Sequence, residues 1–197
     1  MKKPTSEFAF FTSKLSLGVP VIFPTDTLPA LGITPEHSNK LWEIKQRPRN
    51  KPLILMASNK KQLFDFVSPK VRNQANIIAD KYWPGPLTLV LPSIGKEVRL
   101  LNNSSQTIGM RIPGNELALK FLKVTGPLAT TSANISGYMP VSSEEEALKI
   151  FPELPILGSQ DWTDCSGIAS TVIELTDDNK WKILRKGDVI PTNISFE

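Results

Sequence analysis

The sequence predicts an α/β domain in which strands and helices alternate. Short apolar runs typical of buried strands are separated by segments whose apolar residues recur every three or four positions, as in helices docked on a sheet. The chain has 197 residues and no internal repeat or low-complexity tract. This length suits one sizeable domain with its own core, or one domain with a small appendage.

In the first part of the chain, two predicted helices alternate with two predicted strands. Apolar residues at spacings of three and four predict a helix over residues 5–17, which a glycine ends. A run bounded by prolines predicts a strand over residues 19–24. Ser38 is a suitable N-cap for the next helix, and residues 53–57 form an apolar run typical of a buried strand.

The middle of the chain predicts two helices, a strand and a polar loop. Asn59 and Gln62 have the spacing of a capping box. The next helix is predicted over residues 68–82, because proline is well tolerated at its first position. A strand follows at residues 87–91, whereas residues 93–105 are polar without strong periodicity and suggest a mobile flap.

The last part predicts four strands and two helices. The strands are expected at residues 107–112, 127–131, 171–175 and 181–185, the last two forming a hairpin. One helix is predicted through residues 117–122, and a second capping box at Ser143 and Glu146 starts a helix that ends near residue 150.

Composition places few limits on the class of protein. Apolar content of 40% and charged content of 21% are ordinary for a soluble globule, and the net charge of +4 mildly favours anionic partners such as nucleotide or RNA. Cys165 is the sole cysteine, which excludes an intrachain disulfide and suits a reducing compartment. No apolar stretch reaches the length of a signal or membrane segment, so we expect a cytoplasmic protein without membrane association.

A basic stretch is the most distinctive local feature. Cations occupy every second position: Lys45, Arg47, Arg49 and Lys51. Pro48 and Pro52 disfavour helical geometry in the residues before them, so the stretch is expected to run extended with all four cations on one side. Such a row would suit a polyphosphate, although a solvated basic loop is the simpler alternative.

Other patterns narrow the chemistry. Thr25, Asp26 and Thr27 follow the first strand, where they could bind a metal, hold a polar substrate or simply form a turn. Neither of the two common glycine-rich nucleotide motifs is present, and His37 is the sole histidine. An enzyme with these residues would act by positioning its substrates and neutralising their charge, which suits nucleotidyl or phosphoryl transfer.

Several motifs together resemble one family, the YrdC-like threonylcarbamoyl-adenylate synthases. In chain order they are Pro24-Thr25-Asp26-Thr27, Lys45-Gln46-Arg47-Pro48 with Lys51-Pro52-Leu53, Trp83-Pro84-Gly85-Pro86-Leu87-Thr88, Arg111-Ile112-Pro113, Thr131-Ser132-Ala133-Asn134-Ile135-Ser136-Gly137, Ser170-Thr171-Val172 and Leu184-Arg185-Lys186-Gly187. The resemblance extends from about residue 8 to about residue 190 and implies one domain over residues 1–197. It also implies a twisted mixed β-sheet with helices packed on it and a basic ligand-binding cavity.

The resemblance implies a reaction and a set of site residues. L-threonine, bicarbonate and ATP would give threonylcarbamoyl-adenylate and pyrophosphate, with Mg²⁺ on the triphosphate and partner enzymes of tRNA threonylcarbamoylation receiving the product. No metal would be held by protein side chains alone. Lys45 and Arg47 would be catalytic. The implied ATP site is Lys45, Arg47, Arg49, Lys51, Thr107, Ser132, Asn134 and Arg185; the implied threonine site is Thr25, Arg111, Thr130 and Ser170.

These assignments carry expectations for variants. Exposed cations contribute little to folding, so Lys45→Ala and Arg47→Ala are expected to lower turnover far more than stability. Arg111→Ala is expected mainly to raise the threonine requirement.

The sequence departs from the family at the amino-acid pocket. Leu28-Pro29-Ala30 replaces an aromatic, glycine-containing stretch. A histidine that some members have after the Pro-Leu strand is absent, with Met56 and Ala57 in that region, and Ala169 replaces a frequent glutamate. Two alternatives therefore stay open. One is a paralogue that binds ATP but uses another small acceptor, and the other is a non-catalytic module that binds tRNA or double-stranded RNA.

Overall fold

The computed structural model describes residues 6–158, 162–176, 178–192 and 194–196. Seven α-helices lie in this part of the chain: α1 (Ser6–Ser16), α2 (Asn39–Ile44), α3 (Lys60–Phe64), α4 (Arg72–Tyr82), α5 (Glu97–Leu101), α6 (Glu116–Thr125) and α7 (Glu144–Ile150). Eight strands accompany them: β1 (Val21–Phe23), β2 (Ala30–Ile33), β3 (Ile54–Met56), β4 (Leu87–Pro92), β5 (Thr107–Arg111), β6 (Leu128–Ser132), β7 (Thr171–Leu175) and β8 (Trp181–Arg185). No described helix is long and apolar enough to cross a membrane.

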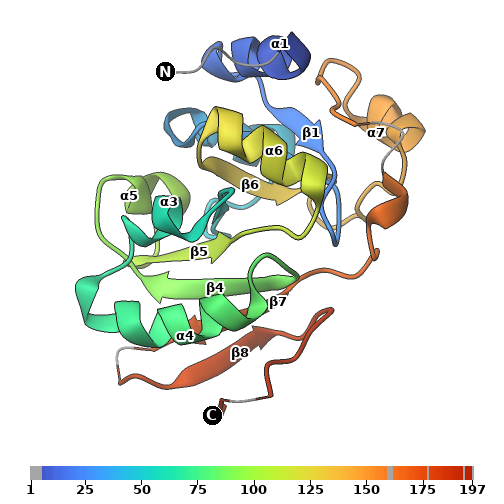
Figure 1. The fold of residues 1–197 in the computed structure, drawn as a ribbon. Helices are drawn as coiled ribbons and strands as arrows, with labels where there is room; N and C mark the ends of the chain where they lie inside the picture. Colours follow the sequence, from blue (N-terminus) through green and yellow to red (C-terminus); the bar gives the residue numbers. More distant parts are fainter. Residues whose placement is uncertain (1–5, 159–161, 177, 193, 197) are drawn as a thin grey trace.

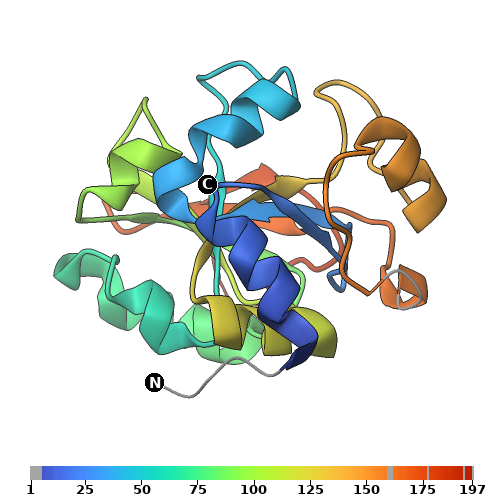
Figure 2. The same ribbon diagram turned by 90° about the horizontal axis from the view of Figure 1, so that it is seen from above.

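All eight strands form one mixed sheet in the order β1-β2-β6-β3-β5-β4-β7-β8. The pairs β3–β5 and β4–β7 are parallel and the others are antiparallel. Figure 1 shows α4 and α6 across one face of this sheet. Figure 2 shows α1 and α6 on one side and the light-blue helix α2 on the other. The mixed sheet with helices packed on it is therefore confirmed.

The two faces of the central strands differ in composition. Successive residues of a strand point to opposite faces. On one face Leu55, Leu89, Met110 and Ile173 are fully buried in the hydrophobic core. The opposite face of these strands mixes polar and charged residues with apolar ones, and it lines a cavity.

The predicted elements are largely confirmed, and two helix starts follow the predicted chemistry. The Asn59 side chain accepts a hydrogen bond from the Gln62 backbone amide (3.1 Å), and Ser143 Oγ accepts one from the Glu146 amide (3.2 Å). Ser38 precedes α2 as predicted, but its hydroxyl donates to Leu100 O (2.8 Å) and does not cap the helix.

The prediction of a loop-like flap over residues 93–105 is wrong in its centre. This segment contains α5, in which Val98 and Leu101 are completely buried. Leu101 O also accepts a hydrogen bond from the Leu53 amide (2.9 Å). Two apolar residues three positions apart are enough to dock this short helix on the core. The polar residues around them made the helical spacing hard to recognise in the sequence.

Candidate functional site

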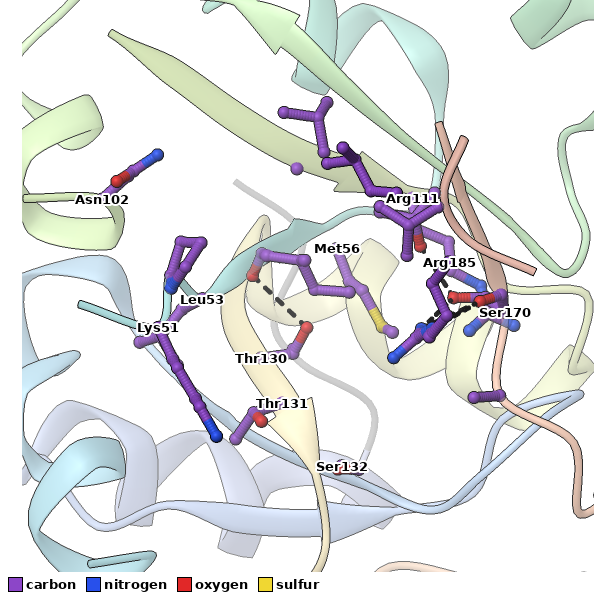
Figure 3. A pocket seen from close by; sticks show the side chains of 18 of the residues that line it. Lys51, Leu53, Met56, Asn102, Arg111, Thr130, Thr131, Ser132, Ser170 and Arg185 are labelled. Carbon is purple, nitrogen blue, oxygen red and sulfur yellow. Dashed lines mark hydrogen bonds between the residues drawn. The ribbon is translucent and has the colours of Figure 1, made fainter. Parts of the chain in front are cut away.

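A cavity of about 510 Å³ lies over the centre of the sheet. Its floor consists of side chains from β3, β4, β5, β6 and β7, and its walls are the segments that follow α2 and α5. Figure 3 shows Lys51 and Asn102 on one side of it and Arg111, Arg185 and Ser170 on the other. The predicted site residues that line it are Arg47, Lys51, Thr107, Arg111, Thr130, Ser132, Ser170 and Arg185. Lys45, Arg49, Thr25 and Asn134 are not among its lining residues.

The prediction that the basic stretch is extended is wrong. Lys45 continues the helical backbone of α2 with φ −83° and ψ −5°, and Gln46 has a left-handed φ of 49°. The Arg47 amide then bonds back to Trp42 O (2.8 Å), and a turn closes between Lys51 N and Pro48 O (3.0 Å). The cations therefore do not form one row, because each leaves the backbone in its own direction.

Lys45 points into the protein, and its side chain is only 1% exposed. The ammonium donates to Ser132 O (2.5 Å), Asn134 O (2.6 Å) and Asn134 Oδ1 (2.7 Å), which uses all three of its donors. Burial, together with the nearby Arg47 guanidinium, lowers the pKa of Lys45 to about 7. This lysine connects the end of α2 to the end of β6 and the residues that follow it, and it has no donor left for a phosphate.

The next two cations have opposite surroundings. Arg47 lines the cavity, where Nε and Nη2 donate to Lys51 O (3.2 Å) and Pro52 O (3.0 Å). Arg49 instead pairs with Glu43 (3.3 Å) and Asn39 (2.6 Å) along the exposed side of α2. Because the Arg49 side chain is directed to α2 and does not line the cavity, the structure does not support the prediction that Arg49 belongs to the ATP site.

Arg111 is held rigidly at one end of the cavity and is 3% exposed. Its Nε donates to Gly85 O (3.0 Å), Nη1 to Thr27 Oγ1 (2.8 Å) and Nη2 to Asp26 Oδ1 (2.6 Å). Burial lowers the pKa of Arg111, and the Asp26 carboxylate opposes that effect. A guanidinium has five N–H donors, so two remain for a ligand in the cavity.

The Thr25-Asp26-Thr27 trio is a turn with one side chain at the site. Thr25 is completely buried, and its hydroxyl donates to Leu28 O (2.7 Å) and accepts from the Thr27 amide (3.1 Å). Cys165 Sγ contacts Thr25 O (3.0 Å) from the other side, and burial raises the pKa of this thiol. Of the trio, Thr27 therefore lines the cavity, whereas Thr25, the member predicted to bind threonine, does not.

Ser170 and Arg185 complete the same end of the cavity. Arg185 Nε and Nη2 donate to Ser170 O (3.0 and 2.8 Å), and the Ser170 hydroxyl lies 2.9 Å from Thr88 Oγ1. Thr88 also lines the cavity, although the sequence did not assign it to the site. It lies two residues before Val90 in β4, so the two side chains are on the same face of the sheet.

The remaining predicted residues contribute hydroxyls and backbone support. Thr107 and Thr130 line the cavity, and Ser132 Oγ donates to Asn134 Oδ1 (2.7 Å). The Asn134 amide nitrogen is also engaged, with Ile135 O (2.9 Å) and Tyr138 O (2.7 Å). Asn134 therefore supports this segment from inside and, like Lys45, does not face the cavity.

The cavity carries uncompensated positive charge. Burial lowers the pKa values of Arg47 and Arg185, and proximity of Arg185 further lowers the pKa of Arg47. Within the described residues neither guanidinium lies within 4.0 Å of a carboxylate, whereas Arg111 has Asp26. Two neighbouring arginines without a counter-charge favour an anionic ligand.

Fold and site together define the class: an α/β domain with a basic small-molecule cavity over a mixed sheet. Comparison with known proteins then identifies the family. A family model named Sua5_yciO_yrdC and described as "Telomere recombination" matches residues 13–187. The chain belongs to this YrdC/Sua5 family and has the YrdC-like fold.

Two curated relatives show how far the similarity extends. The chain is 35% identical over 162 residues to a threonylcarbamoyl-AMP synthase of Pyrococcus abyssi, a match covering 80% of this chain and 47% of that protein. It is 33% identical over 143 residues to a protein of the same name from Yersinia pestis, covering 70% and 75% respectively. The chain thus spans about half the length of the archaeal relative.

Solved structures support the same family and include a second branch. P. abyssi Sua5 in complex with L-threonine superposes with a TM-score of 0.81 at 32% identity, covering 90% of this chain and 53% of that one. Escherichia coli YciO superposes with a TM-score of 0.73 at 28% identity, covering 90% and 87%. Both branches of the family therefore remain relevant to the function.

Proposed function

We propose that this protein is a threonylcarbamoyl-AMP synthase, which makes threonylcarbamoyl-AMP and pyrophosphate from L-threonine, bicarbonate and ATP. The observation that carries the proposal is the pair of uncompensated arginines, Arg47 and Arg185, in one cavity with Arg111. Relatives of that name at 33–35% identity support it. The product is proposed to serve tRNA threonylcarbamoylation through partner enzymes.

The arrangement suits a reaction between two anions. The threonine amine and bicarbonate condense to a carbamate with loss of water, and a carbamate oxygen then attacks the α-phosphate and displaces pyrophosphate. Arg47 and Arg185 offset the repulsion between the carbamate and the triphosphate. The two free donors of Arg111, next to the Thr27 and Ser170 hydroxyls, provide a receptor for the threonine carboxylate.

Magnesium fits this cavity as an ion carried mainly by the nucleotide. The described residues contain no cluster of three histidine, cysteine, aspartate or glutamate side chains. Mg²⁺ commonly uses phosphate oxygens and water with few protein ligands, and the Ser132 hydroxyl, which lines the cavity, is the protein contact we propose for it. When bound, the ion supplies further charge neutralisation on the triphosphate.

The test is the dependence of pyrophosphate release on both co-substrates. With L-threonine and bicarbonate present, the purified protein is expected to release pyrophosphate from ATP, and the adenylate is expected in the products by mass spectrometry. Omitting either co-substrate should abolish the release. Release that continues without threonine would contradict the proposal.

Arg47→Ala and Arg49→Ala form a matched pair for the phosphate site. The two residues lie two positions apart, but only Arg47 lines the cavity, while Arg49 pairs with Glu43. Loss of a charge that stabilises the transition state costs about 3 kcal/mol, so Arg47→Ala should lower kcat/KM by about 100-fold. Arg49→Ala should leave kcat/KM within about two-fold, because exposed ion pairs contribute little. Equal losses of kcat/KM in the two variants would show that Arg49 contributes to the reaction as much as Arg47, although it does not line the cavity.

A YciO-like activity with another small acceptor is the second candidate. Leu28 and Met56 line the cavity near Arg111: Met56 is its register partner, and Leu28 follows Thr27, to which Arg111 donates. Ligand binding to the native state raises the melting temperature, so thermal-shift measurements with ATP and different amino acids separate the candidates. A shift for L-threonine larger than those for L-serine and L-valine favours the synthase, and a larger shift for another amino acid favours the paralogue.

A further inference from the structure

Glu174 is a carboxylate inside an otherwise basic cavity. It lines the cavity from β7 and is half-buried. Within the described residues it has no hydrogen bond and no ion pair, although Lys182 is its direct register partner on β8. Neither the synthase reaction nor a reaction with another small acceptor gives this carboxylate a role, and a negative charge next to a phosphate would weaken binding.

Strand register places Glu174 far from Arg111 and Arg185. Ser170, Val172 and Glu174 alternate along the same face of β7, so Glu174 lies about 13 Å from Ser170 at 3.3 Å per residue. The Arg185 guanidinium is bonded to Ser170, at the opposite end from Glu174. On β5 Arg111 and Thr107 are likewise four residues apart, with Arg111 at the arginine end.

The surroundings of Glu174 suit the uncharged half of a nucleotide. Its row across the sheet is Ile54, Gly109 and Val90, an apolar floor in which a Cβ on Gly109 would lie 2.8 Å from Ile54 Cγ2. Thr107 and Asn102 line the cavity at this end and present polar groups. Lys51 is also on this side, but it comes from the opposite wall and extends towards Thr131 and Ser132 (Figure 3).

We propose that Glu174 accepts a hydrogen bond from the nucleoside half of the bound nucleotide and thereby sets the direction in which that nucleotide lies. The triphosphate then lies towards Arg47 and Arg185, while ribose hydroxyls or the exocyclic amine of the base meet the carboxylate. The same charge repels phosphate from this end. This inference rests on the proposed use of ATP but assigns a specificity residue that the family motifs do not include.

The test is nucleotide binding to the intact protein, measured by calorimetry without threonine so that no reaction is needed. Glu174→Ala is expected to weaken ATP binding by about ten-fold or more, the usual effect of losing a hydrogen bond to a charged acceptor. Inorganic tripolyphosphate, which has no nucleoside, should bind Glu174→Ala at least as tightly as the unchanged protein. Glu153→Ala is the matched control, since Glu153 is an exposed carboxylate outside the cavity.

Nucleotide analogues identify the group that Glu174 contacts. If it is the ribose, 2′-deoxy-ATP or 3′-deoxy-ATP binds the unchanged protein about ten-fold more weakly than ATP, but binds Glu174→Ala as ATP does. If it is the base, inosine triphosphate shows that pattern instead. Glu174→Ala binding ATP as tightly as the unchanged protein would overturn the inference alone. Absence of ATP binding by the unchanged protein would overturn it together with the proposed function, whereas ATP binding with threonine-independent turnover would contradict only the latter.

Discussion

Replacing Lys45 with methionine is expected to lower the free energy of unfolding by about 2–4 kcal/mol, because three oxygens lose their donor inside the protein. The partners are Ser132 O, Asn134 O and Asn134 Oδ1, and the side chain is 1% exposed. This result would correct the sequence-based expectation, which treated Lys45 as an exposed phosphate ligand. Urea denaturation at pH 6, where the native Lys45 side chain is an ammonium with three N–H donors, measures it.

Lys51→Met is the control for the loss of a cation from the same segment. Lys51 is exposed on the cavity rim, so its replacement should change the free energy of unfolding by no more than about 0.5 kcal/mol. If Lys45→Met is as stable as Lys51→Met, the three contacts are not essential to the fold and Lys45 is free to act on the ligand.

Lys45 should also give the protein a specific pH dependence. Folding lowers its pKa from 10.5 to about 7, so between these values the unfolded chain binds a proton that the native protein does not. The free energy of unfolding therefore rises with pH in this window, by at most about 1.4 kcal/mol per unit. The difference in stability between the unchanged protein and Lys45→Met should grow from pH 7 to pH 9. A constant difference would show that Lys45 keeps its proton throughout.

Arg111→Met is expected to destabilise the fold by about 3–5 kcal/mol, because it leaves Asp26 as an uncompensated carboxylate. Asp26 Oδ1 lies 2.6 Å from Arg111 Nη2, and its other oxygen, Oδ2, is already buried without a hydrogen bond. A raised threonine requirement, which the sequence predicted as the main effect, is then accompanied by a loss of stability. Urea denaturation with and without L-threonine separates the two.

A double variant isolates the charge pair. Combining Asp26→Asn with Arg111→Met removes both charges, so it should be more stable than Arg111→Met alone, as replacement of a whole buried pair usually is. If Arg111→Met unfolds at the same urea concentration as the unchanged protein, the pair is not needed for folding. Arg111 would then serve the ligand only.

The spacing of apolar residues and the capping residues at helix ends were enough to place most elements, because helix and strand formation depend mainly on these local features of the sequence. The capping boxes at Asn59 and Ser143 and the strand runs before and after them are examples. Helix α5 was missed because its docking depends on Val98 and Leu101 meeting a core built by distant segments. The alternation of side chains along β7 places Glu174 on the same face as Ser170, so the sequence could have pointed to it as a site residue. The sequence did not show, however, that this face lines a cavity.

The sequence by itself determined the family, the order of the elements and the presence of a basic cluster, because motifs and periodicity are local properties. Only the tertiary structure decided which cations serve a ligand. The left-handed backbone at Gln46 ends the alternation on which the predicted row depended, and Lys45 points into the interior, where it donates to the carbonyls of Ser132 and Asn134 at the end of β6. Arg47 faces the cavity and Arg49 faces Glu43, since the direction of a long side chain is set by partners that lie far along the chain or across a turn.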